Sequence, residues 1–109
     1  MYAAMTTLHV LPGKKDTMIA TSKSSAFNEA VSLLQQLPGF NRLQVMVDSD
    51  SDKSYVISFY ETEAHAIAAG DSPQVKEAWK KLVAYMDMES MVRTVCEVVA
   101  ESQTVTVTV

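Results

Sequence analysis

The chain has 109 residues, enough for one hydrophobic core, and its 48% apolar and 20% charged residues are typical of a globular domain. The net charge of −4 comes without a long basic cluster, which argues against a nucleic-acid partner, and no apolar run reaches the roughly 18 residues of a membrane span. The N-terminus also lacks the pattern of a secretory signal. We therefore expect a cytoplasmic protein with one domain over residues 1–101 and an extended C-terminal tail over residues 102–109.

The sequence gives little support for a metal site. Cys96 is the single cysteine, which excludes an internal disulfide and a thiolate-rich metal site. Asp48, Asp50 and Asp52 alternate in a short acidic stretch, but the glycine and the glutamate of a calcium-binding loop are missing at their places. We interpret this stretch as a solvated turn, and we expect no bound metal.

The first part of the chain predicts a strand and then a helix. Residues 4–11 form the expected strand, which Pro12 and Gly13 end. The helix begins near Asp16, and its second half has apolar residues at helical spacing. Residues 21–25 are poor in helix formers, so a kink is expected there. The apolar stripe consists of Phe27, Ala30, Val31, Leu34 and Leu37.

The middle of the chain predicts a hairpin. Pro38 and Gly39 end the helix, and residues 40–48 and 54–61 read as strands separated by a polar turn. Consecutive large apolar side chains in residues 54–61 place apolar groups on both faces of this strand.

The last part predicts two helices and a strand. Thr62 is a good N-cap for a short helix that ends at Gly70, and Ser72 with Pro73 begins a second helix. Residues 91–101 alternate and read as the fourth strand. The second helix carries a stripe of Val75, Ala78, Trp79, Leu82, Val83 and Met86.

The order of elements predicts an α+β fold of the ferredoxin-like βαββαβ type. Right-handed crossovers place the helices on one face of a four-stranded antiparallel sheet. Because the strands are apolar on both faces, the other face needs a cover. The simplest cover is the same sheet of a second subunit, so we expect a homodimer through sheet-to-sheet packing.

The motifs at the ends of these elements resemble those of the antibiotic biosynthesis monooxygenase (ABM) family. They are Pro12-Gly13-Lys14 after the first strand, Pro38-Gly39-Phe40 before the second, Phe59-Tyr60-Glu61-Thr62 after the third, and Ser72-Pro73 at a helix start. The resemblance covers about residues 4–100. The resemblance implies a dimeric α+β barrel. The family includes oxygenases that use no cofactor and act on phenols and quinols.

The chain departs from the haem-degrading branch of this family. Thr6, Tyr60 and Trp79 stand where that branch has an asparagine, a tryptophan and the haem-ligating histidine. Many members also have a histidine at the place of Ala69. We therefore expect no haem and no other cofactor.

The resemblance also suggests site residues. Thr6 and Tyr60 share the strand face that would look toward the helices, with Trp79 opposite, and Phe27 and Leu34 complete a possible apolar pocket for substrate. An ordinary core is the alternative interpretation. His65 and His9 are the candidate catalytic proton acceptors, although structural roles are open for both, with His9 on the opposite strand face at the expected dimer interface.

Two functions remain open from the sequence. The first is a cofactor-free monooxygenase acting on a small aromatic phenol or quinol in a pocket between sheet and helices. The second is a non-catalytic dimeric module that binds a small apolar or aromatic ligand.

Overall fold

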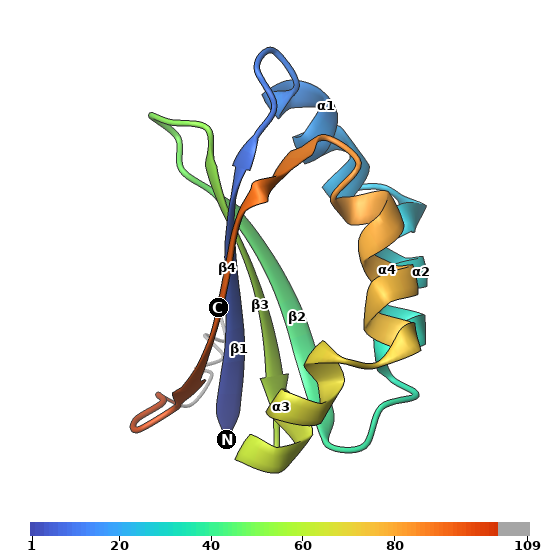
Figure 1. Ribbon diagram of the computed structural model, residues 1–109, viewed down its shortest axis with the longest axis vertical. Helices are drawn as coiled ribbons and strands as arrows, with labels where there is room; N and C mark the ends of the chain where they lie inside the picture. The colour runs from blue at the N-terminus through green and yellow to red at the C-terminus, as the bar shows by residue number, and fades with distance from the viewer. Residues whose placement is uncertain (103–109) are drawn as a thin grey trace, which may run out of the picture.

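The computed structural model describes residues 1–102, except for the side chain of Lys81. Most of the predicted tail, residues 103–109, lies outside the described residues. The sheet has the order β2-β3-β1-β4 with every neighbouring pair antiparallel, and the helices lie on one side of it (Figure 1). This is the predicted ferredoxin-like fold. The elements are β1 (Tyr2–Val10), α1 (Lys15–Ser22), α2 (Ser25–Leu34), β2 (Phe40–Val47), β3 (Lys53–Tyr60), α3 (Glu63–Gly70), α4 (Pro73–Leu82) and β4 (Met86–Glu97).

The helix starts follow the capping chemistry of the sequence. The Thr62 hydroxyl accepts a hydrogen bond from the His65 backbone N–H at 3.1 Å, and the Ser72 hydroxyl accepts one from Val75 at 3.2 Å. Pro73 opens α4 at a position where no N–H is needed. Both predicted N-caps are confirmed.

The expected long helix is two helices. The stretch at residues 21–25, which is poor in helix formers, interrupts the helix at Lys23 and Ser24. The hydroxyls of Thr21 and Ser22 donate back to the carbonyls of Thr17 and Met18, a bonding pattern that often bends helices. Ser24 then caps α2 by accepting a hydrogen bond from the Ala26 N–H at 3.2 Å.

The predicted start and end of the last strand were wrong. We expected Met86 on a helix and the strand over residues 91–101, but α4 ends at Leu82 and β4 covers Met86–Glu97. Met86 fits the helical stripe by spacing, yet it pairs with Val10 in the sheet. Pairing with β1 therefore overrides the local periodicity.

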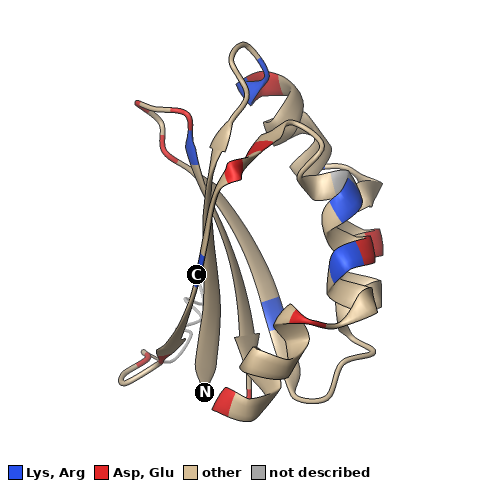
Figure 2. Ribbon diagram, viewed as in Figure 1, with Lys and Arg blue, Asp and Glu red and all other residues tan. Residues whose placement is uncertain are grey.

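The core lies between the sheet and the helices. Ala4, Thr6, Leu8 and Val10 alternate along β1 and are buried on the helix-facing side. Ser54, on the neighbouring strand, is buried with its hydroxyl donating to the Leu8 carbonyl at 3.0 Å. Figure 2 shows that most Lys, Arg, Asp and Glu residues lie on helices and turns.

The opposite side of the sheet, which we call the outer face, carries no helix (Figure 1). The strand registers arrange its residues in three rows across the sheet. The sequence prediction of large apolar groups on both faces of β3 is confirmed, since Tyr55, Ile57 and Phe59 alternate with the buried Val56 and Tyr60. The rows are Met46–Tyr55–Thr7–Val92, Gln44–Ile57–Met5–Thr94 and Arg42–Phe59–Ala3–Cys96.

Candidate functional site

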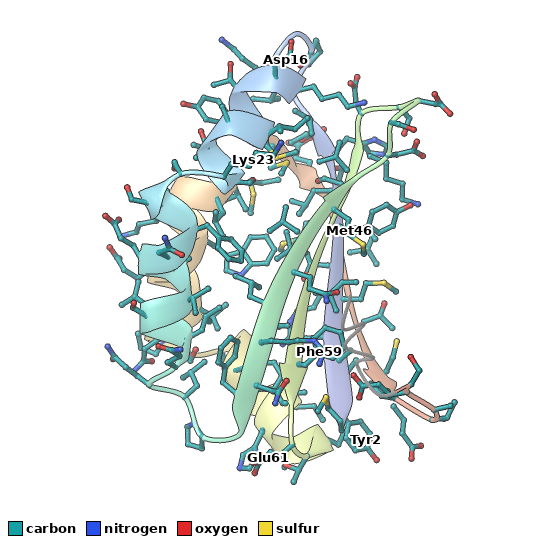
Figure 3. All side chains as sticks on the ribbon, turned by 180° about the vertical axis from the view of Figure 1, so that it is seen from behind. Tyr2, Asp16, Lys23, Met46, Phe59 and Glu61 are labelled. Carbon is teal, nitrogen blue, oxygen red and sulfur yellow. The ribbon has the colours of Figure 1, made fainter. Side chains whose placement is uncertain are left out.

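A cavity of about 370 Å³ lies between the α1–α2 break and β2. This volume is in the range of roughly 300–1,000 Å³ that is usual for small-molecule sites. Figure 3 shows Lys23 at the junction of the two helices. We call this space the edge cavity, because β2 is an edge strand. Its lining residues are Ile19, Ser22, Lys23, Phe27, Val45 and Val47.

Local structure explains why these residues meet. Val45 and Val47 are two apart on β2, so both point to the helix-facing side. Val45 pairs with the buried Val56, which confirms that orientation. The α1–α2 break brings Ser22 and Lys23 to the cavity instead of continuing a regular helix over β2.

One of the predicted substrate-binding residues, Phe27, lines the edge cavity. Leu34 is buried in a cluster with Ala30, Ala78 and Leu82. Trp79 packs against a cluster of Leu8, Val10, Met18 and Met86, and the cavity residues Ile19 and Val47 pack against the same cluster. Trp79 therefore belongs to the structure behind the cavity wall.

Thr6 lies in the same row across the sheet as the cavity residue Val45, two strands farther from the β2 edge. Val45, Val56, Thr6 and Arg93 are successive partners across the four strands. Thr6 is only 2% exposed. Arg93 donates from Nη2 to the Ala66 carbonyl at 2.7 Å, so its guanidinium is fixed to α3 and does not line the edge cavity.

Tyr60 lies farther away, four residues along β3 from Val56, which is about 13 Å at the usual rise of a strand. It is 1% exposed and packs with Ala4, Ala66 and Ala69, and its ring meets that of Phe40 edge to face at 5.9 Å. Burial raises the pKa of Tyr60 above 10.0, while a hydrogen bond with Ser58 and the charge of Arg93 act in the opposite direction. The phenol is therefore neutral at physiological pH.

His65 lines a second, smaller hollow of about 180 Å³ beside α3. Its Nδ1 atom is buried and has no hydrogen-bond partner among the described residues. The ring lies against Gly39, at a place where a Cβ on that glycine would be 2.1 Å from Nδ1. Leu37, Pro38, Ala68, Ala69 and Ser72 complete this hollow.

His9 is exposed and lies at the other end of the sheet, on the strand face opposite Thr6, as predicted. Its backbone N–H donates to the Ser90 hydroxyl at 2.9 Å. The outer face also has an open hollow of about 390 Å³ near this end. The structure thus brings neither histidine to the edge cavity. The outer hollow is lined by Met5, Met46, Val47, Asp48 and Tyr55.

The sequence reasoning missed most of the cavity wall. Val45 and Val47 could have been found from their shared strand parity, and the poor helix formers at residues 21–25 were a signal for the break that exposes Lys23. Within residues 1–102 no group of three or more His, Cys, Asp or Glu side chains is placed to hold a metal ion. None of the helices in that range is long and apolar enough to cross a membrane.

Comparison with solved structures gives a consistent set of neighbours. One is an antibiotic biosynthesis monooxygenase from Bordetella bronchiseptica (described as putative), with a TM-score of 0.70, 14% identity and coverage of 91% of this chain and 97% of that chain. SnoaB, a cofactor-independent oxygenase from Streptomyces nogalater, has a TM-score of 0.60, 17% identity and coverage of 92% and 95%. A dimeric ferredoxin-like protein of unknown function from Jannaschia has a TM-score of 0.59, 15% identity and coverage of 90% and 100%. At these identities the likeness shows the fold.

The fold and the edge cavity define a ferredoxin-like α+β protein with a ligand-sized space beneath its helices. The sequence model of the antibiotic biosynthesis monooxygenase family matches residues 1–81, which is most of the chain. The chain belongs to this family. A comparison with curated proteins gives no significant match.

Proposed function

We propose that the protein is a cofactor-free monooxygenase that binds a small phenol or quinol in the edge cavity. The observation that carries this proposal is a mostly apolar cavity of about 370 Å³ on the helix-facing side of an ABM-family fold. The likeness to a cofactor-independent oxygenase supports the choice of chemistry. An aromatic ring fits such walls because it loses water contact on both faces.

The substrate would supply the electrons in this reaction. An ionised phenol with an unsubstituted ring carbon can reduce O₂, so that one oxygen atom becomes the second carbonyl of a quinone and the other leaves as water. The protein would hold the ring, favour the ionised form of the phenol and exclude bulk water. The mostly apolar lining of the edge cavity, with Lys23 among its residues, suits these tasks.

We propose that Phe27 contacts the ring directly. A longer substrate would extend from Val45 across the sheet row toward Thr6, with Trp79 and Leu34 supporting the helix side. Tyr60 would act at the far end, toward α3. These four residues remain proposed binding residues. Thr6, Leu34 and Tyr60 are buried, so a ligand would reach these three only as the helical layer moves, whereas Trp79 is half-buried.

The proposed proton acceptors are His65 and His9. His65 is the better candidate of the two, because its hollow is on the same side of the sheet as the edge cavity. His9 lies on the outer side.

Oxygen uptake with a panel of hydroxylated naphthalenes and quinols tests the proposal. Uptake should require protein, yield the quinone at one equivalent of O₂, and fall at least tenfold in Phe27→Ala. Phe59→Ala, which removes the same half-buried side chain from the outer face and outside the cavity lining, is the matched control. Uptake that stays the same when His65 and His9 are both replaced by Ala would remove the assigned base while leaving the oxygenase proposal in place.

We further propose that two chains pair through their outer faces, in the cytoplasm. The outer face is a helix-free surface with Met46 at 46% and Val92 at 59% exposure. Large uncovered apolar patches are unusual on monomers. The likeness to a dimeric ferredoxin-like protein supports a dimer.

The second candidate function is a ligand-binding module without catalysis. One observation favours it: neither histidine lines the edge cavity, and its lining has no carboxylate. Binding of naphthols without any oxygen uptake over the panel would support this candidate over the oxygenase.

A further inference from the structure

The wall of the edge cavity has two polar residues, Ser22 and Lys23, among four apolar ones. The Ser22 hydroxyl already donates to the Met18 carbonyl at 3.0 Å and lies 3.4 Å from the Met18 sulfur. The hydroxyl proton of Ser22 is therefore used in a hydrogen bond within α1. Lys23 remains as the polar group that can meet a ligand.

The Lys23 ammonium has no charged partner among the described residues. The ion pairs found there are Arg42–Glu101 and Lys80–Glu77, and both lie elsewhere. Asp48 follows the wall residue Val47, but its carboxylate accepts the Asp50 N–H at 2.9 Å and belongs to the β2–β3 turn. Lys15, at the start of α1, donates to carbonyls of the same turn.

Geometry and charge together define what the cavity selects. A lysine at the rim of an apolar space lays its four-carbon stem along the wall and keeps its ammonium at the water-facing mouth. An uncompensated positive charge at that place attracts an ionised oxygen, and it lowers the pKa of a phenol held beside it.

We propose that Lys23 is a specificity-determining residue that selects aromatic ligands carrying an ionised oxygen. The ring occupies the space between Phe27 and Val45, and the carboxylate or phenolate oxygen lies at the mouth beside the ammonium. This inference rests on the proposed function only in placing the ligand in the edge cavity. It adds that the ligand is anionic and that Lys23 recognises its charge.

The first experiment compares two probes of equal shape, 2-naphthoate and its neutral amide 2-naphthamide, by calorimetric titration of the full chain at low salt. We expect 2-naphthoate to bind about fivefold more tightly, the size of an exposed charge pair, with the preference shrinking as salt is raised. Lys23→Met should remove the preference and leave 2-naphthamide binding unchanged. Lys23→Arg should retain it, and Lys14→Met, an exposed lysine outside the cavity lining, should have no effect.

The second experiment separates a phenolate from a carboxylate as the natural group. A nitrophenol changes its absorption on ionisation, so its pKa can be read in the bound state. The protein should lower that pKa, and Lys23→Met should restore it; a lowered pKa identifies phenolates as ligands, whereas a preference seen only with 2-naphthoate identifies carboxylates.

The outcomes distinguish this inference from the function on which it rests. Equal binding of both naphthalene probes, or a preference for 2-naphthoate that survives Lys23→Met, overturns the role of Lys23 while the cavity stands. Failure of both probes to bind overturns the aromatic-ligand site itself, and the assignment to Lys23 with it.

Discussion

Gly39 is the residue on which the turn before β2 depends. Its φ is +75°, and a Cβ there would overlap the His65 ring, whereas Gly13 has nearly the same φ of +74° with open space around it. A side chain at either glycine would be strained by the backbone conformation, but only a side chain at position 39 would also overlap a neighbouring residue.

We expect Gly13→Ala to lower the free energy of unfolding by about 1–2 kcal/mol, the cost of a left-handed conformation for a residue with a side chain. Gly39→Ala should cost at least 1 kcal/mol more, because the His65 ring must also move. Urea denaturation of both variants measures the difference. Adding His65→Ala to Gly39→Ala should return part of the loss, and equal losses in the two single variants would contradict the overlap.

Tyr60 predicts a dependence of stability on alkaline pH. Its pKa is raised by burial, so the unfolded chain ionises this phenol near pH 10.0 while the folded chain holds the proton. Its stabilising contribution is complete below pH 10 and is lost as pH rises through the folded pKa. In Tyr60→Phe the unfolding free energy should fall less steeply above pH 10 than in the wild type. Tyr55→Phe, on the outer face, is the control, and parallel pH curves for Tyr60→Phe and the wild type would argue against a raised pKa.

At the scale of elements, one side chain ties the start of α1 to a neighbouring turn. Lys15 donates from Nζ to the carbonyls of Asp48, Ser49 and Ser51 at 2.7, 3.2 and 2.8 Å, which ties the start of α1 to the β2–β3 turn. The other end of α1 is the break at Lys23. The helix that walls the edge cavity is therefore fixed at one end by the turn and joined at the other by a bend.

Lys15→Met should loosen α1 more than it destabilises the fold. We expect a loss of about 1 kcal/mol in local stability, since hydrogen bonds to an ammonium are replaced by water at an exposed site. Hydrogen exchange of the Met18 and Lys23 amides, which bond within this helix, should speed up about fivefold while the strands keep their protection. Lys14→Met provides the comparison, and unchanged exchange in α1 would show that the turn does not hold the helix.

The elements also show what could be predicted from the sequence. The caps at Thr62 and Ser72 are local chemistry, so they were predictable, as was the weak point at residues 21–25. The start of β4 was not, because Met86 fits a helical stripe and only its pairing with Val10 decides the matter. The edge cavity depends on how far α1 and α2 stand from β2, a distance that no local pattern encodes.

For the whole molecule, the proposed pairing of outer faces leads to a direct test. Val92 is 59% exposed on the outer face and Ile67 is 54% exposed on α3. Val92→Asp should convert a dimer to a monomer in light scattering at micromolar concentration, because a carboxylate would be buried without a partner. Ile67→Asp, of similar exposure, should remain dimeric. A monomeric wild type would contradict the assembly outright.

The alternation along β3 has one more consequence, for the lengths of chain that this fold accepts. Val56 faces the helices and Ile57 the outer face, so one added residue within β3 would exchange the two sides for every residue after it. A single insertion in β3 would therefore turn its core residues, such as Tyr60, toward the proposed assembly surface and its outer-face residues into the core. Insertions and deletions should therefore be tolerated mainly in exposed turns, such as residues 49–52, because a change of length there leaves the alternation of side chains along β3 unchanged.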